Sequence, residues 1–286
     1  GSLVAAPGAA RAAERDDEPL SPPVELRHDL RVDIPVAAGL LAATVGVRLV
    51  RDDLEPSSCR LCDPARPADV NAVDAWFRES LVRRDTGPAN VTSYALAFGA
   101  APASAVGLTA LAAVVDRRGG GFLVDFLVMA EGGLTAMLLA ESLESIVLRE
   151  RPYVRATADE AERAALVAQT GAFHSFPSGH VAAAFGAAAA SGTVASMRGY
   201  RLAPLVWASG LMIGVATGYT RIAADRHYFT DTLAGAGLGA LVGAGVPLLF
   251  HRPVARERDV AGAPPRLWAS GAPTSGGATL TVGGAF

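Results

Sequence analysis

The chain contains no lysine, and all 25 of its basic residues are arginines. Apart from a protonated histidine, every cationic side chain that contacts an anion must therefore be a guanidinium, whose planar fork of donors suits phosphate and carboxylate oxygens. The formal net charge is only -3. A charge this small creates no whole-chain field that attracts nucleic acid, so nucleic acid is not an expected partner.

Cysteine is also scarce. The chain has two, Cys59 and Cys62, in a Cys-x-x-Cys spacing. Two thiols cannot complete a tetrahedral zinc site alone, and the surrounding sequence lacks the thioredoxin-like strand and helix that a redox pair requires. A local disulfide is the first interpretation, while free thiols and a metal shared with other ligands stay open.

Charged residues form 19% of the chain, hydrophobic residues form 51%, and the mean hydropathy is +0.31. This composition is more apolar than that of typical soluble proteins and favours a membrane protein. Six apolar segments are each about as long as a helix that crosses about 30 Å of hydrocarbon. Alanine and glycine dominate them, and such small residues let helices approach closely in lipid. The segments are 34–50, 91–115, 122–148, 179–197, 202–219 and 233–250.

These segments predict an all-α fold, a bundle of six transmembrane helices over residues 34–252. Residues 1–33 have no apolar periodicity and are predicted to be a disordered leader, and residues 253–286 are predicted to be a flexible tail. Glu131 in the third segment weakens this prediction, because an ionised carboxylate at mid-membrane costs at least about 2.5 kcal/mol. A soluble helical bundle is therefore the alternative.

A polar loop, residues 51–90, separates the first two segments. It contains the two cysteines and a stretch that places Trp76 and Phe77 on one face of a helix. That amphipathic helix is expected either at the membrane interface or packed on the bundle.

Arginines outnumber acids in the connections 116–121 and 196–201 and at the start of the tail. By the positive-inside rule these segments face the cytoplasm. With six spans, both termini lie inside, and the loops after the first, third and fifth helices lie on the other side. We therefore predict a multi-pass protein of the inner (plasma) membrane, with those loops facing the periplasm or exterior.

Three polar clusters, residues 148–155, 176–185 and 220–231, fall at helix ends on that non-cytoplasmic side. In the second cluster Ser178 can cap the following helix, so that the N–H groups of Gly179 and His180 form an anion site. His180, in the first helical turn, can reach a leaving oxygen as a general acid.

The third cluster pairs an imidazole with a carboxylate. Asp231 follows His227 by four residues, so on a helix the two share a face. The carboxylate can hold one imidazole nitrogen protonated and leave the other as a nucleophile. Arg151 and Arg221 add planar forks suited to phosphate oxygens.

Together the clusters resemble the PAP2 (type 2 phosphatidic acid phosphatase and vanadium haloperoxidase) superfamily over about residues 90–250. Its signature is Lys, six residues, Arg-Pro; then Pro-Ser-Gly-His; then Ser-Arg, five residues, His, three residues, Asp. Several spaced motifs in one chain make the resemblance specific. The matching residues are Arg151, Pro152, Pro177, Ser178, Gly179, His180, Arg221, His227 and Asp231, with Thr220 replacing the serine.

The resemblance implies an active site at the non-cytoplasmic end of the bundle, where His227 attacks phosphorus, Asp231 orients it and His180 protonates the leaving group. It implies no metal and no cofactor. The expected partners are a lipid phosphate substrate and membrane lipids, and no oligomeric state is predicted. The residues expected to stabilise the phosphoryl oxygens are Arg151, Ser178, Gly179 and Arg221.

Glu144 stands where the family signature has its lysine. Losing one charge-assisted hydrogen bond costs about 1.5 to 3 kcal/mol, far less than losing the nucleophile, so a weakened or retuned enzyme is expected. Arg149 or Arg155 could supply the missing charge, and Glu144 could instead orient Arg151 or contact a cationic headgroup.

The substrate stays open among phosphatidate, phosphatidylglycerol phosphate, a polyprenyl diphosphate and a lipid A phosphate. One alternative is a soluble relative, either an acid phosphatase or a vanadate-dependent haloperoxidase. Another, suggested by Glu144 alone, is a membrane protein that binds lipid phosphates without hydrolysing them.

Overall fold

The computed structural model describes residues 24–51, 59–60, 70–168, 171–254, 266–274 and 277–285. The chain divides into two units, Gly1–Arg252 and Pro253–Phe286. Over the described residues, the first unit consists of helices and their connections, and the second contains an antiparallel hairpin.

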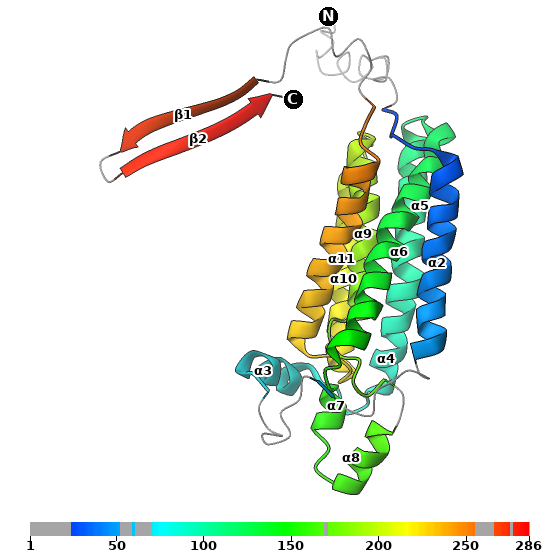
Figure 1. Ribbon diagram of the computed structural model, residues 1–286, viewed down its shortest axis with the longest axis vertical. Helices are drawn as coiled ribbons and strands as arrows, with labels where there is room; N and C mark the ends of the chain where they lie inside the picture. The colour runs from blue at the N-terminus through cyan, green and yellow to red at the C-terminus, as the bar shows by residue number, and fades with distance from the viewer. Residues whose placement is uncertain are drawn as a thin grey trace, which may run out of the picture. The chain divides into compact units, whose positions relative to one another are not determined.

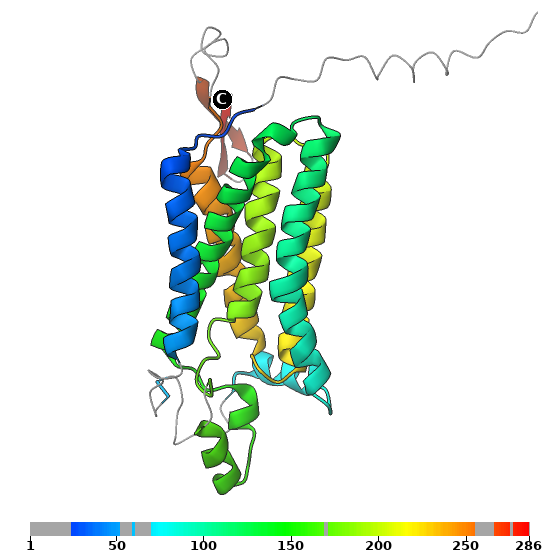
Figure 2. The ribbon, with the colours of Figure 1, turned by 90° about the vertical axis from the view of Figure 1, so that its right-hand side faces the viewer.

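Among the described residues, six long helical rods run side by side in the first unit (Figures 1 and 2). One rod combines three consecutive elements: α4 (Gly87–Tyr94), the π-helical turn η1 (Ala95–Ala100) and α5 (Ala101–Val115). The other rods are α2 (Leu30–Arg51), α6 (Phe122–Val147), α9 (Gly179–Met197), α10 (Ala203–Ala223) and α11 (Phe229–Phe250). A 3-10 turn, η2 (Gly119–Gly121), precedes α6. Three short helices gather at one end of the bundle: α3 (Ala72–Leu81), α7 (Pro152–Arg155) and α8 (Glu160–Val167).

Helix α9 packs against α6, α10 and α11 at the centre of the bundle. Most of its residues are Ala, Gly or Ser, and most are buried. The backbones of α9 and α11 approach so closely that a Cβ added at Gly239 would lie 2.5 Å from the Ala182 carbonyl oxygen. Small residues thus allow helices with few large side chains to pack tightly.

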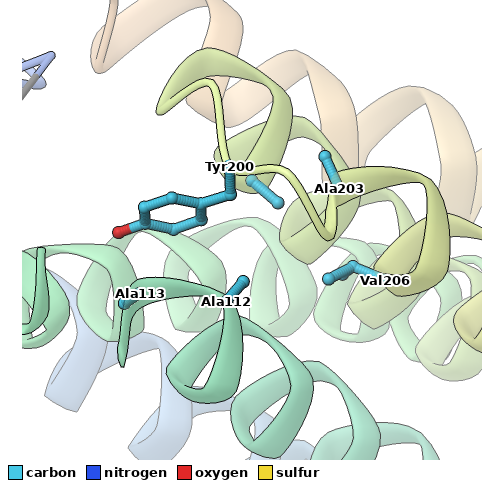
Figure 3. Packing of buried hydrophobic residues seen from close by; sticks show 6 residues of the cluster. Ala112, Ala113, Tyr200, Ala203 and Val206 are labelled. Carbon is cyan, nitrogen blue, oxygen red and sulfur yellow. The ribbon is translucent and has the colours of Figure 1, made fainter. Parts of the chain in front are cut away.

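A small apolar cluster joins α5 to the turn between α9 and α10 (Figure 3). The Tyr200 hydroxyl in this cluster donates to Asp125 Oδ2 at 2.7 Å, and Arg198 pairs with the same carboxylate at 2.6 Å. Both contacts tie the turn to α6. The residues labelled in Figure 3 are Ala112, Ala113, Tyr200, Ala203 and Val206.

Four helical stretches of the described chain are long and apolar enough to cross a membrane: Leu30–Val50, Gly87–Val115, Gly119–Val147 and Phe229–Phe250. These four stretches indicate a membrane protein. Helices α9 and α10 share the bundle but are not among the four, because Ala, Gly, Ser and Thr dilute their hydropathy. Six spans therefore remain a prediction.

The acids of α6 face the interior of the bundle, where other elements supply their partners. Glu131 lies 3.0 Å from His251, Glu141 pairs with Arg48, and Asp125 binds Arg198 as described above. Since paired carboxylates avoid much of the cost of burial, Glu131 is compatible with a membrane bundle.

The N-terminal boundary of the helical region differs from the prediction. Helix α2 begins at Leu30, earlier than the predicted start at residue 34. Leu26 is buried, and the Arg27 N–H donates to the Arg252 carbonyl at 2.9 Å. Leu26 and Arg27 therefore attach this segment to the bundle, although most of its residues are exposed, as expected of a solvated leader. The rest of the predicted leader lies outside the described residues.

The predicted flexible tail contains two strands, β1 (Arg266–Thr274) and β2 (Gly277–Ala285). They pair antiparallel, with Arg266 opposite Ala285 and Thr274 opposite Gly277. The sequence prediction has no strand here because Gly, Ala and Pro are frequent. The alternation of Thr and aliphatic residues at 279–282 is the pattern that favours pairing.

Candidate active site

The three polar clusters converge at the end of the bundle that carries α3, α7 and α8 (Figure 1). Here α6 and α10 end and α9 and α11 begin. A polar cavity of about 290 Å³ lies between them. Its lining residues are Arg48, Asn90, Tyr94, Glu141, Glu144, Arg151, Gly171, Gly179, His180, Arg221, Arg226 and His227.

His227 lies in the loop between α10 and α11 and is only 2% exposed. Its Nδ1 is 2.7 Å from the Ser175 carbonyl oxygen. A carbonyl only accepts, so Nδ1 carries the proton and Nε2 bears the lone pair. Nε2 lies 3.3 Å from Arg151 Nη1, which can only donate. The nitrogen that faces the cavity is thus an available nucleophile.

Asp231 does not bind the imidazole directly. Its Oδ2 is 4.0 Å from His227 Nδ1, and it accepts instead from the Ser175 hydroxyl at 2.6 Å and the Tyr228 N–H at 2.8 Å. The expectation that both residues share a helical face is wrong, because α11 begins at Phe229 and His227 precedes it. The carboxylate therefore orients the imidazole through Ser175.

Ser175 is a candidate site residue that the sequence analysis misses. Its hydroxyl meets Asp231 and its carbonyl meets His227, across sequence separations of 56 and 52 residues. It lies outside every motif used above, so no local signal identifies it.

The environment of His227 lowers the pKa of its imidazole well below the ordinary value of 6.5. Burial is the main cause, and the positive charges of Arg221 and Arg151 add to it. The imidazole is therefore neutral at neutral pH, as a nucleophile must be.

The start of α9 presents Ser178, Gly179 and His180 to the cavity. Ser178 is the N-cap residue, but its side chain makes no capping bond, and its buried Oγ has no hydrogen-bond partner among the described residues. The His180 ring lies against the ring of Tyr94, with centroids 4.4 Å apart, and against that of Phe98 at 4.8 Å. These aromatic contacts fix His180 beside the cavity.

Arg151 and Arg221 approach the cavity from different elements. Arg151, just before α7, donates to the carbonyls of Gly171 at 2.6 Å and Arg226 at 3.1 Å. Arg221, in the last turn of α10, donates to Asn90 at 2.9 Å and to Ser93 at 3.0 Å. Both guanidinium groups are thereby held in place before any anion binds.

Glu144 accepts a hydrogen bond from the Gly179 N–H at 3.0 Å. Its carboxylate therefore uses the amide that the sequence analysis expects to bind a phosphate oxygen. Close by, Arg48 of α2 pairs with Glu141 and lies over the Phe98 ring, 4.5 Å from its centroid. Arg48 thus brings a cation to the side of the cavity where the family lysine is absent.

Arg48 is a second residue without an assigned role in the sequence analysis. Its position inside an apolar segment is the feature that could have identified it, since a charged residue in a predicted span usually has a functional or structural partner.

A second layer of charges supports the loop between α10 and α11. Arg149 pairs with Asp231 and Asp74, and it donates to Thr230 at 2.8 Å. Asp74, fully buried on α3, also accepts from the Thr230 N–H at 2.8 Å. Burial raises the pKa of the Asp74 carboxyl, but the bonds from Thr230 and Arg149 outweigh it and lower that pKa overall.

Helix α3 is attached to the bundle through this layer. Phe77 stacks on Phe229, with ring centroids 3.9 Å apart, while Trp76 is exposed. Phe77 therefore packs on the bundle, which is one of the two placements predicted for this amphipathic helix.

The site defines a class of protein: a helical bundle that presents a buried neutral histidine and several arginines to a polar cavity. Residues 125–254 match the family model of the PAP2 superfamily, the superfamily that the spaced motifs of the sequence resemble. Among solved structures, the chain is similar to the first transmembrane PAP2 type phosphatidylglycerolphosphate phosphatase from Bacillus subtilis. That match has 19% identity, a TM-score of 0.33, and coverage of 75% of this chain and 93% of the other. No curated relative matches the chain significantly.

Proposed function

We propose that the protein is a membrane-bound phosphatase that hydrolyses a lipid phosphate or lipid pyrophosphate through a phosphohistidine on His227. The observation that carries the proposal is the orientation of His227. Its Nδ1 proton is fixed on Ser175, and its Nε2 lone pair faces Arg151 in a cavity lined by four arginines.

In the proposed first step, His227 Nε2 attacks phosphorus and the bond from phosphorus to the leaving oxygen breaks. His180 donates a proton to that oxygen. Arg151 and Arg221 stabilise the charge on the equatorial oxygens, together with the hydroxyl of Ser178. In the second step, water loses a proton to His180 and attacks phosphorus, which releases inorganic phosphate and regenerates His227.

An apolar cavity supports a substrate with a hydrocarbon tail. It has a volume of about 600 Å³ and is lined by apolar residues of α2, η1, α5, α6 and α9. Phe98 borders this cavity and also contacts His180. A headgroup at His227 and a chain along Phe98 would occupy both spaces. Phosphatidate, phosphatidylglycerol phosphate, polyprenyl diphosphates and lipid A phosphates all have this form.

One observation favours a second candidate, a protein that binds lipid phosphates without hydrolysing them. Glu144 holds the Gly179 amide and adds a negative charge where phosphate oxygens would gather. Because His227, His180 and Asp231 keep their places, we favour hydrolysis in which Glu144 withdraws from the amide when substrate binds.

We further propose that the site faces the periplasm or exterior. The arginine-rich connections lie at the other end of the bundle, as the positive-inside rule requires for the cytoplasmic side. Cys59 is disulfide-bonded and packs near Leu148 at the site end, which suits an oxidising compartment. Cys62 lies outside the described residues.

The test is phosphate release from detergent-solubilised lipid phosphates and diphosphates, with EDTA present, by wild type, His227→Ala and His28→Ala. His28 is an exposed histidine outside the site, so its variant controls for the loss of an imidazole. We expect release by wild type and His28→Ala, and a loss of several orders of magnitude in His227→Ala. An alkaline quench of wild type during turnover should trap phosphohistidine.

Binding of the lipids without any release would contradict hydrolysis and support the second candidate. Bromide oxidation by peroxide that requires added vanadate would instead identify the haloperoxidase alternative.

A further inference from the structure

Three ionisable side chains meet at the end of the bundle opposite the proposed active site. Asp33 comes from the first turn of α2, Glu131 from α6 and His251 from the C-terminus of α11. Each is at least 93% buried, and their potential ligand atoms all lie within 4.8 Å of one another. Figure 1 shows the start of α2 and the end of α11 at the same end of the bundle.

The hydrogen bonds of His251 set the direction of its lone pair. Nδ1 lies 3.0 Å from the Arg27 carbonyl oxygen, so Nδ1 carries a proton. Nε2 lies 3.0 Å from Glu131 Oε2. A neutral imidazole in this tautomer directs its lone pair at a carboxylate, so either a second proton or a metal cation must lie between the two groups. Histidines that bind metals usually donate their other N–H to a carbonyl or carboxylate in this way.

A single proton on His251 would leave negative charge uncompensated. Glu131 Oε1 is buried and has no hydrogen-bond partner among the described residues. Asp33 Oδ2 accepts from the Asp29 N–H at 2.9 Å, a backbone contact that brings no positive charge. Since an unpaired buried charge is costly, a divalent cation balances the two carboxylates better than one proton does.

We infer that Asp33, Glu131 and His251 form a binding site for a first-row divalent metal ion, with Zn²⁺ bound more tightly than Mn²⁺. Two carboxylate oxygens and one imidazole nitrogen suit such ions, whereas Mg²⁺ and Ca²⁺ prefer oxygen ligands alone. Metal–ligand distances of about 2.0 to 2.2 Å require side-chain movements of only about 1 Å from the present separations. A cavity of about 560 Å³ borders the cluster and leaves room for water ligands.

The ion would link helices that are far apart in sequence. In sequence, Asp33 and His251 lie near the start and the end of the helical region. Along α6, Glu131 lies about 20 Å from Glu144 of the active site, at a rise of 1.5 Å per residue. The proposed role is therefore structural, a cross-link of α2, α6 and α11 that is separate from the phosphatase site.

The experiment uses the full chain in detergent, stripped with EDTA and titrated with Zn²⁺ against a fluorescent chelator. We expect one Zn²⁺ per wild-type chain and a rise in the thermal midpoint, with no rise for Mg²⁺ at the same concentration. Glu131→Gln and His251→Gln should each weaken Zn²⁺ binding by at least about tenfold. His28→Gln is the matched control, because His28 borders the same cavity but is exposed, and its binding should equal that of wild type.

Absence of Zn²⁺ binding by wild type would overturn the inference, and so would binding that neither variant weakens. His251 would then be an imidazolium that donates one hydrogen bond to the Glu131 carboxylate and one to the Arg27 carbonyl oxygen. If the variants fail to fold, X-ray absorption of Zn²⁺-loaded wild type decides. One imidazole among oxygen ligands supports the site, and two or more imidazoles place the ion elsewhere, at the active-site histidines for example.

Discussion

At the scale of single residues, the cavity holds four arginines and two acids, Glu141 and Glu144. Glu144 is the acid that would compete with a phosphate oxygen for the Gly179 amide. Its carboxylate occupies the Gly179 amide at 3.0 Å. We expect Glu144→Gln to raise kcat/KM roughly tenfold, because the negative charge is removed while the side-chain shape is kept. Glu144→Lys should raise it further, by restoring the cation of the family signature.

Steady-state kinetics on the preferred lipid phosphate checks this, with Glu162→Gln on the exposed face of α8 as the control for the same chemical change. A fall in turnover in both Glu144 variants would show that this carboxylate has a specific role in the reaction.

The lowered pKa of His227 gives a pH dependence with a definite sign. The ordinary imidazole pKa is 6.5, and burial together with Arg221 and Arg151 lowers it in the folded protein. Between 6.5 and that lower value, the unfolded chain takes up a proton that the folded chain does not, so stability falls as the pH falls through this window. The nucleophile itself stays neutral there.

We therefore expect the acid limb of kcat/KM that reports the nucleophile to lie below pH 6.5. The rate of phosphohistidine formation in rapid-quench experiments between pH 4.5 and 8 measures it. A limb above 6.5 would mean that the imidazole is charged at rest, and that the buried site is more hydrated than its geometry indicates.

The residues that the sequence could and could not predict differ in the range of their contacts. His180, His227 and Asp231 stand in spaced motifs, and the structure brings them to one end of the bundle. Ser175, Arg48 and Asp74 act across separations of 52, 93 and 156 residues, which periodicity and spacing do not reveal. The linkage of Asp231 to His227 through Ser175 follows only from the tertiary arrangement.

At the scale of elements, the sequence predicts helix interiors better than helix ends. Helix α9 runs from Gly179 to Met197 as predicted, because Pro177 and Ser178 mark its start. Helix α11 begins at Phe229 rather than at residue 233, since its polar first turn hides it from a hydropathy criterion. The π-helical turn η1 lies within a run of small and apolar residues that is equally suited to an α-helix.

The close contact of α9 with α11 yields a test at this scale. A Cβ at Gly239 would lie 2.5 Å from the Ala182 carbonyl oxygen, whereas one at Gly237 of the same helix meets nothing within 4 Å. We expect Gly239→Ala to destabilise the protein by about 1 to 3 kcal/mol through overpacking. Thermal unfolding in detergent measures this.

Gly237→Ala is the control, and it should leave the thermal midpoint unchanged or slightly higher, because alanine favours helices. Equal midpoints for the two variants would mean that the helices separate more easily than their packing suggests.

At the scale of the whole molecule, the proposed orientation can be measured. In a chain with both cysteines changed to serine, Ala161→Cys places a thiol on α8 at the site end, and Gly120→Cys places one in the connection before α6. We expect a membrane-impermeant maleimide to label intact cells through Ala161→Cys alone. Both variants should be labelled after permeabilisation, and labelling of Gly120→Cys alone in intact cells would reverse the orientation.

The pairing of the α6 acids also has a consequence for how the chain is made. Asp125 finds Arg198 73 residues later, and Glu131 finds His251 120 residues later. When α6 leaves the ribosome, these two carboxylates reach the bilayer before their partners have been synthesised. The pairing of both carboxylates with their partners can therefore follow only after α9 and α11 have been synthesised, so the order of synthesis delays the final burial of α6.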